Sequence, residues 1–92
     1  MVEIEFIFNG IKLIIQSNEE EKMKYIFYKF ADKVNKDINN LSFIYNENII
    51  NEELTLFQLI NVKDQNNKSM RILVNEKYNI DESYINSSNI LF

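Results

Sequence analysis

Apolar and polar residues alternate over the first part of the chain, and this pattern predicts two strands. Residues 2–8 place an apolar side chain at every second position, a period typical of a strand with one buried face. Asn9-Gly10, the preferred dipeptide of a two-residue type I′ turn, follows, and residues 11–17 alternate again. We therefore predict an antiparallel hairpin that sets apolar residues opposite one another on one face: Phe8 with Ile11, Phe6 with Leu13, and Ile4 with Ile15.

The hydrophobic period then changes to that of a helix. Asn18 is expected to cap the helix, with Glu21 three residues later where its side chain reaches back. The acidic triplet at 19–21 would lie in the first turn, where the helix dipole favours negative charge. We expect the helix to end near residues 35–37 and to bury one stripe: Met23, Ile26, Phe27, Phe30 and Val34.

Shorter elements follow along the rest of the chain. Residues 41–45 read as a third strand, 46–48 as a turn and 49–50 as a very short fourth strand. Residues 52–60 are apolar and turn-rich and are expected to close the open end of the core. Residues 63–69 read as a polar loop, and 70–74 alternate as the last strand. Residues 76–92 have no clear period, so we predict one domain over residues 1–75 and a tail or extension over 76–92.

Composition narrows the classes of activity. The formal net charge is −4, which argues against a nucleic-acid or anionic-membrane surface. The chain has no histidine and no cysteine, so the usual general base, thiol nucleophile and commonest metal ligands are missing. No glycine-rich phosphate loop or calcium loop is present. We therefore expect that the chain is not an enzyme and that it has no cofactor, no metal site and no small-molecule substrate.

The same sequence bears on compartment and source. No secretory leader and no apolar run near the ~20 residues of a membrane span is found. With no disulfide, we expect the protein in the cytoplasm, with the nucleus also possible, and not secreted. Asparagine, isoleucine and lysine, which have A/T-rich codons, make up 39 of 92 residues, and we read this as the base bias of an AT-rich protist genome.

The order of these elements resembles the ubiquitin-like β-grasp family. The opening hairpin, the helix near residue 19, the stretch 42–46, the Thr55-Leu56 pair and the final strand carry the resemblance. It implies an α+β fold with a mixed sheet of order 2-1-5-3-4, one helix on one face, and a short helical turn before the last strand. The helix would then cover a core of Val2, Ile4, Phe6, Phe8, Ile11, Leu13, Ile15, Phe43, Met70, Ile72 and Val74.

One departure from the family concerns conjugation. Conjugated modifiers end in two glycines on a flexible tail that an activating enzyme threads and adenylates. This chain has no glycine after Gly10 and ends in Asn89-Ile90-Leu91-Phe92. We therefore expect a ubiquitin-like protein that is not joined to lysines.

The resemblance also indicates a surface for a protein partner. Ubiquitin docks through an exposed aliphatic patch on its sheet, and the matching positions here are Ile44 and Leu73. The strand alternation independently turns both away from the core. On the same face we expect Ile7 and Ile14, and the predicted site is this patch with its flanking cations: Ile7, Lys12, Ile14, Ile44, Arg71 and Leu73.

Three alternatives to this docking surface stay open. Scattered aliphatic residues in an isoleucine-rich chain need no function. The tail could cover the patch. A partner strand could add to the outer edge of the second strand, as in relatives among the Ras-binding domains.

Two functions agree with the whole pattern. The first is a non-catalytic, ubiquitin-like adaptor that is monomeric alone and docks a protein partner through its sheet face. The second is a small structural subunit of a large cytoskeletal or ciliary assembly, held through the sheet face and the tail. The sequence does not identify the partner or the biological process.

Overall fold

The alternating residues at the amino end form the predicted hairpin. In the computed structural model, which describes residues 1–77, strands β1 (Val2–Phe8) and β2 (Ile11–Ser17) pair antiparallel. Asn9 and Gly10 have φ angles of 51° and 77°, the two positive values that a type I′ turn requires. The register sets Phe8 opposite Ile11 and continues without a bulge, which confirms the predicted pairing.

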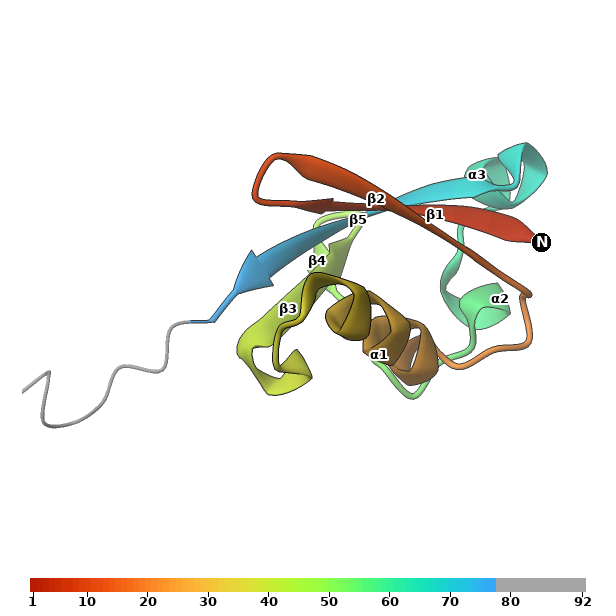
Figure 1. Cartoon of the computed structure of the whole chain (residues 1–92). Coiled ribbons are helices and arrows are strands. Elements are labelled where there is room, and N and C mark those ends of the chain that lie inside the picture. Colours follow the sequence, from red (N-terminus) through yellow and green to blue (C-terminus); the bar gives the residue numbers. More distant parts are fainter. Residues whose placement is uncertain (78–92) are drawn as a thin grey trace, which may run out of the picture.

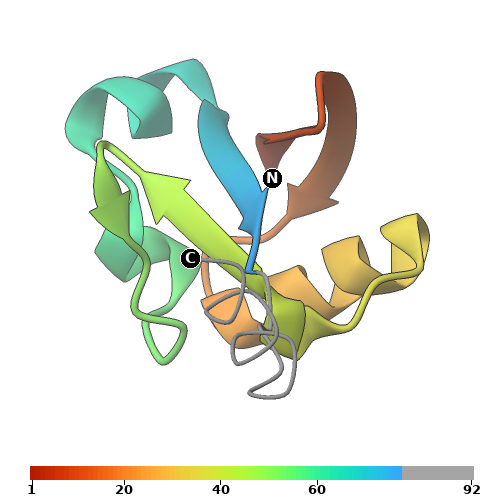
Figure 2. The same cartoon turned by 90° about the vertical axis from the view of Figure 1, so that its left-hand side faces the viewer.

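Three further strands complete a mixed sheet. β5 (Ser69–Glu76) runs parallel to β1, and β3 (Leu41–Tyr45) pairs antiparallel with β5. The short β4 (Asn48–Ile49) closes the far edge, so the order is β2-β1-β5-β3-β4, as the resemblance implied (Figure 2). The predicted bounds of the fourth strand, 49–50, were one residue late. Ile50, which follows β4, is buried in the core, and its N–H donates to the Phe43 carbonyl of β3 at 2.9 Å.

One long helix covers a single face of this sheet (Figure 1). α1 (Met23–Val34) buries the predicted stripe, with Ala31 in addition and Val34 packed at its margin. The helix ends where expected, because Asn35 adopts the left-handed conformation at φ 55° that terminates many helices.

The predicted start of this helix was wrong. Asn18 does not cap α1; its side-chain oxygen accepts from the Glu20 N–H in a turn that precedes the helix. No acidic residue lies in the first turn of α1, and the cap position is Lys22, which makes no side-chain cap. The first N–H groups of the helix instead donate to the distant loop that follows β4. The Met23 N–H donates to the Leu54 carbonyl, and the Lys24 N–H donates to the Glu52 carbonyl.

The core lies between α1 and the sheet, and it matches the prediction at all but one of the named positions. Leu13 is only partly buried, but it packs against the core. Ile11 is 65% exposed, and its assignment to the core was wrong. Alternation fixes the side of the sheet on which Ile11 lies, but the turn end of the hairpin is not covered by α1 (Figure 1).

The segment between β4 and β5 contains two short helices. α2 (Leu56–Leu59) begins at Thr55 with a capping box to Gln58 and closes the core with Leu56, as predicted. The predicted polar loop at 63–69 was wrong, because α3 (Val62–Asn67) and the first residue of β5 occupy it. A 3-10 turn (Ile38–Asn40) precedes β3. The predicted tail lies outside the described residues from position 78 onward, and the domain division at 75 stays a prediction.

Candidate functional site

The register of the sheet aligns four aliphatic residues on the face that α1 leaves uncovered. Ile7 of β1 pairs with Leu73 of β5, Leu73 pairs with Ile44 of β3, and Ile44 pairs with Ile49 of β4. Side chains at directly paired positions point to the same face of a sheet. These four side chains therefore form one line across four adjacent strands, which we call the aliphatic row: Ile7, Leu73, Ile44 and Ile49.

The row is accessible within the described chain. Leu73 is 47% exposed and Ile49 is 77% exposed, while Ile7 and Ile44 are half-buried between their neighbours. The alternate residues of the same strands, such as Phe6, Phe43 and Ile72, are buried beneath α1. The face assignments of Ile7, Ile44 and Leu73 made from the sequence are thus confirmed, although their function as a docking site is not tested by the geometry.

Ile49 lies in the row but was not among the residues predicted from the sequence, and the predicted Ile14 does not belong to the row. A two-residue strand shows no measurable alternation, so its pairing with Ile44 was not readable from the sequence. Ile14 is 48% exposed on the same face, but it pairs with Glu5 rather than with an aliphatic residue. Ile14 therefore lies at a corner of the face, diagonal to Ile7.

Both cations of the predicted site form ion pairs with the same carboxylate, that of Glu5, which was not a predicted site residue. Glu5 lies between Lys12 and Arg71, with Lys12 Nζ 3.2 Å from one oxygen and an Arg71 guanidinium nitrogen 3.3 Å from the other. The hydrogen bond from Lys12 lowers the pKa of Glu5, and the bond from Arg71 adds to this lowering. Arg71 and Lys12 stay exposed, so both cations remain open to an acidic group on a partner.

A polar depression adjoins this cluster. It has a volume of about 310 Å³ and is lined by residues that include Glu5, Asn46, Asp64, Asn67 and Arg71. Tyr45 also lines this depression; its hydroxyl donates to Asp64 at 2.5 Å and accepts from the Asn61 N–H at 3.2 Å, which ties β3 to α3. Polar and charged side chains therefore lie beside the aliphatic row on the candidate face, as a polar rim lies beside the apolar core in protein interfaces.

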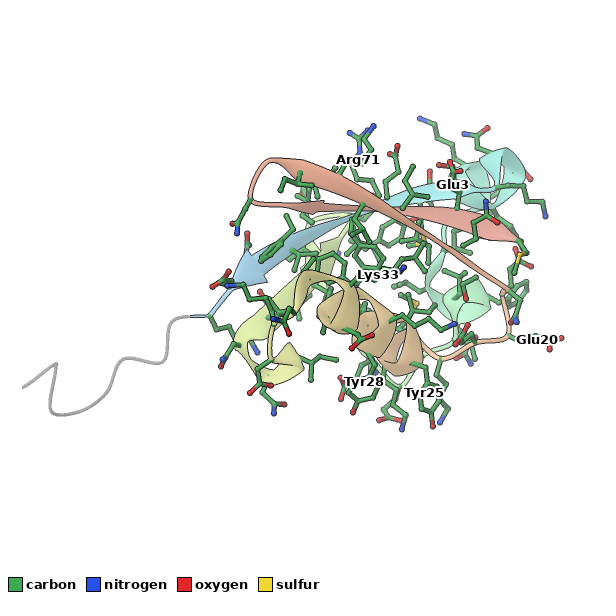
Figure 3. All side chains as sticks on the ribbon, viewed as in Figure 1. Glu3, Glu20, Tyr25, Tyr28, Lys33 and Arg71 are labelled. Carbon is green, nitrogen blue, oxygen red and sulfur yellow. The ribbon has the colours of Figure 1, made fainter. Side chains whose placement is uncertain are left out.

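Arg71 and Glu3 project from the sheet on the side away from α1, and Tyr25 and Tyr28 project from the opposite side (Figure 3). The two tyrosines are about half exposed, with ring centroids 6.5 Å apart. Among residues 1–77, no cluster of three or more His, Cys, Asp or Glu side chains is placed to hold a metal ion. None of the helices in that range has the length and apolar character needed to cross a membrane.

Comparison with known proteins shows the fold but no close relative. No family model matches the chain, and no curated protein matches it. The structure is similar to that of Caldiarchaeum subterraneum ubiquitin, with a TM-score of 0.69 and 9% identity over 84% of this chain and 94% of that one. It is also similar to ATBAG1, solved in complex with HSP70, with a TM-score of 0.68 and 8% identity. That match covers 99% of this chain and 49% of ATBAG1, so the chain spans about half of that protein.

Proposed function

We propose, from the ubiquitin-like β-grasp fold of the chain, that it is a non-catalytic module that binds a protein partner through the outer face of its sheet. The observation that carries the proposal is the aliphatic row. Four aliphatic side chains lie in register on the uncovered face, with an ion-paired cluster beside them. Contiguous exposed apolar surface with a polar rim is typical of protein-docking sites.

Each part of the site has its own role in this proposal. Leu73 and Ile49 are the exposed anchors of the row, and Ile7 and Ile44 form its floor. Lys12, Ile14 and Arg71 contribute to the rim, where the two cations favour an acidic group on the partner because the Glu5 charge balances only one of them.

The proposal also covers conjugation and compartment. The single glycine of the chain, Gly10, lies in the hairpin turn, so we propose that the chain acts without being joined to lysines. A chain without cysteine has no disulfide to form, and we place its action in the cytoplasm or nucleus. ATBAG1, a neighbour by fold, was solved with a protein partner, which supports binding as the activity but does not identify this chain's partner.

Alanine variants of the row test the proposal. Leu73→Ala and Ile49→Ala should each weaken binding of a captured partner by about five- to thirty-fold, equivalent to roughly 1–2 kcal/mol, because each removes an exposed anchor. The tagged full chain is used for capture, the partner is identified, and the affinity of each variant is then measured by titration.

Val62→Ala is the matched control. Val62 is 72% exposed, close to the 77% of Ile49, but it lies on α3 and away from the row. The Val62→Ala variant should bind the partner as tightly as the wild type. Thermal melts should show that this control and the two row variants are all folded. Equal affinities for the wild type and both row variants would move the site to another surface.

A specific observation favours a second function, a structural subunit of a larger assembly. Exposed large apolar side chains are not confined to the outer face, because Tyr25, Tyr28 and Phe57 are each about half exposed or more elsewhere. A subunit surrounded by several neighbours would cover them all. The two functions separate on co-purification, since a subunit is recovered with fixed stoichiometry and an adaptor is not.

A further inference from the structure

The outer edge of β2 is a regular strand edge without a partner among the described residues. β2 ends the sheet, and its seven residues pair one to one with β1 without a bulge. Beyond this pairing, no hydrogen bond of residues 1–77 reaches the backbone of residues 11–17. Regular, unblocked edges tend to pair with another strand, and native proteins protect them with bulges, prolines or charges.

The hairpin turn determines which backbone groups face outward. In a hairpin with a two-residue turn, the pair that flanks the turn is hydrogen-bonded, and hydrogen-bonded pairs then alternate along the strands. Here that pair is Phe8 and Ile11, so Ile11, Leu13 and Ile15 direct their N–H and C=O groups toward β1. Lys12, Ile14 and Gln16 direct theirs outward, giving three donors and three acceptors along the free edge.

The side chains on this edge offer little protection. Ile11 and Ile14 are 65% and 48% exposed, one on each side of the sheet. Lys12 is the single charged residue of β2, and its ammonium is held 3.2 Å from Glu5 on the neighbouring strand. The charge that would repel an approaching strand is therefore partly compensated by Glu5, which Lys12 shares with Arg71.

We propose that β2 pairs antiparallel with β2 of a second copy of this chain, about a two-fold axis through Ile14. This register sets Ile14 opposite Ile14 and Lys12 opposite Gln16, so all six outward backbone groups of each copy find partners. It also sets Leu13 opposite Ile15 at a position where paired side chains are close.

Other symmetric registers satisfy fewer groups or oppose like charges. An axis through Leu13 or Ile15 pairs only two of the three outward residues with one another. An axis through Lys12 brings two ammonium groups face to face. With the axis through Ile14, the two Lys12 residues lie four positions apart along the strands, about 14 Å. Complete pairing of the outward backbone groups and the separation of the two Lys12 ammonium groups thus favour this register for a second copy as the occupant.

The proposal goes beyond the docking function and does not depend on it. An axis perpendicular to the sheet keeps both outer faces on the same side, so the pair would present two aliphatic rows on one continuous surface. A single strand pair is a small interface, so we expect a dissociation constant on the order of 0.1–1 mM for the isolated chain. This is compatible with a monomer at micromolar concentration.

A charge substitution at position 16 tests the register. Gln16→Lys places a lysine opposite Lys12 twice in the dimer, while within the chain position 16 lies opposite Glu3, so the fold gains an ion pair. Sedimentation equilibrium of the full chain should show wild-type dimer at ~1 mM and a dissociation constant at least about tenfold weaker for Gln16→Lys. The thermal midpoint of Gln16→Lys should be equal to or higher than that of the wild type.

Disulfide cross-linking gives an independent measurement, because the chain has no cysteine of its own. Ile14→Cys should form a cross-linked dimer under oxidised glutathione at least about tenfold faster than Ile49→Cys, since paired residues on the axis lie within disulfide range. Ile49 is the more exposed of the two and lies on the opposite edge of the sheet. Equal rates, or a wild-type chain that remains monomeric at ~1 mM, would overturn the proposal and leave the edge to a strand of another protein.

Discussion

At the scale of single residues, two groups of polar side chains fix how neighbouring elements meet. In the described chain, no buried side-chain nitrogen or oxygen lacks a hydrogen-bond partner. The Tyr45 hydroxyl joins β3 to the start of α3 through Asn61 and Asp64. The end of β2 is joined to α1 in a similar way. The Ser17 hydroxyl donates to the Glu21 carboxylate, which also forms an ion pair with Lys29 of α1.

Removing the Tyr45 hydroxyl should lower stability and change its dependence on pH. Tyr45→Phe leaves the Asn61 N–H and the Asp64 carboxylate without this partner, and we expect a loss of about 1–2 kcal/mol in urea unfolding at neutral pH. Burial, followed by the hydrogen bond to Asp64, raises the pKa of Tyr45 from 10.0 to about 12. The folded state therefore holds this proton more tightly than the unfolded state does.

The sign of the pH effect follows from that difference. The stabilisation by the protonated hydroxyl is complete below pH 10 and falls as the pH rises toward 12, by an amount of the same order as the loss caused by Tyr45→Phe. The stability gap between the wild type and Tyr45→Phe should therefore narrow over this range. Parallel stability curves for the two proteins from pH 9 to 12 would contradict this role for Tyr45.

Glu21 should give the opposite pH dependence. The hydrogen bond from Lys29 lowers the pKa of Glu21 below its ordinary 4.5, with a smaller contribution from Ser17, against the effect of partial burial. Its stabilisation is present above about pH 4.5 and is lost as the pH falls through the lowered pKa. Glu21→Gln should be less stable by up to about 1 kcal/mol at pH 7 and should converge with the wild type in acid. The adjacent Glu20→Gln, at an exposed position, is the control and should follow the wild type throughout.

At the scale of elements, the sequence predicted those whose signals are local and missed those set by distant contacts. The hairpin register follows from Asn9-Gly10 and the alternation around it, and both are properties of adjacent residues. The start of α1 was placed too early, because carbonyls of Leu54 and Glu52 satisfy its first N–H groups and no side-chain cap is needed. α3 was missed because a short surface helix of polar residues has no apolar stripe.

Cap substitutions test this account of the helix starts. Thr55→Ala should destabilise the chain by about 1 kcal/mol, because Thr55 forms a reciprocal capping box with Gln58 at the start of α2. Asn18→Ala should cost less than about half of that, since Asn18 bonds only within an exposed turn. Chemical unfolding of both variants provides the comparison, and a larger effect at Asn18 would restore it as the helix cap.

At the scale of the whole molecule, the sheet divides the chain into a covered face and an open one. Alternation alone placed Ile7, Ile44 and Leu73 on the open face, so most of the candidate site was predictable from the sequence. Ile49 required the tertiary pairing of a two-residue strand, and the Lys12–Glu5–Arg71 cluster required the order of β2, β1 and β5. The exposure of Ile11 at the tip of the hairpin depends on where α1 lies over the sheet, and the spacing of residues along the strand does not predict that position.

The most direct test of the docking face is a methyl chemical-shift map of the full chain titrated with its captured partner. We predict that shifts concentrate on methyl groups of Ile49, Leu73 and Ile44, while those of buried Ile26 and of Val62 on α3 change little. Shifts confined to residues beside Tyr25 and Tyr28, with the aliphatic row unchanged, would contradict the account.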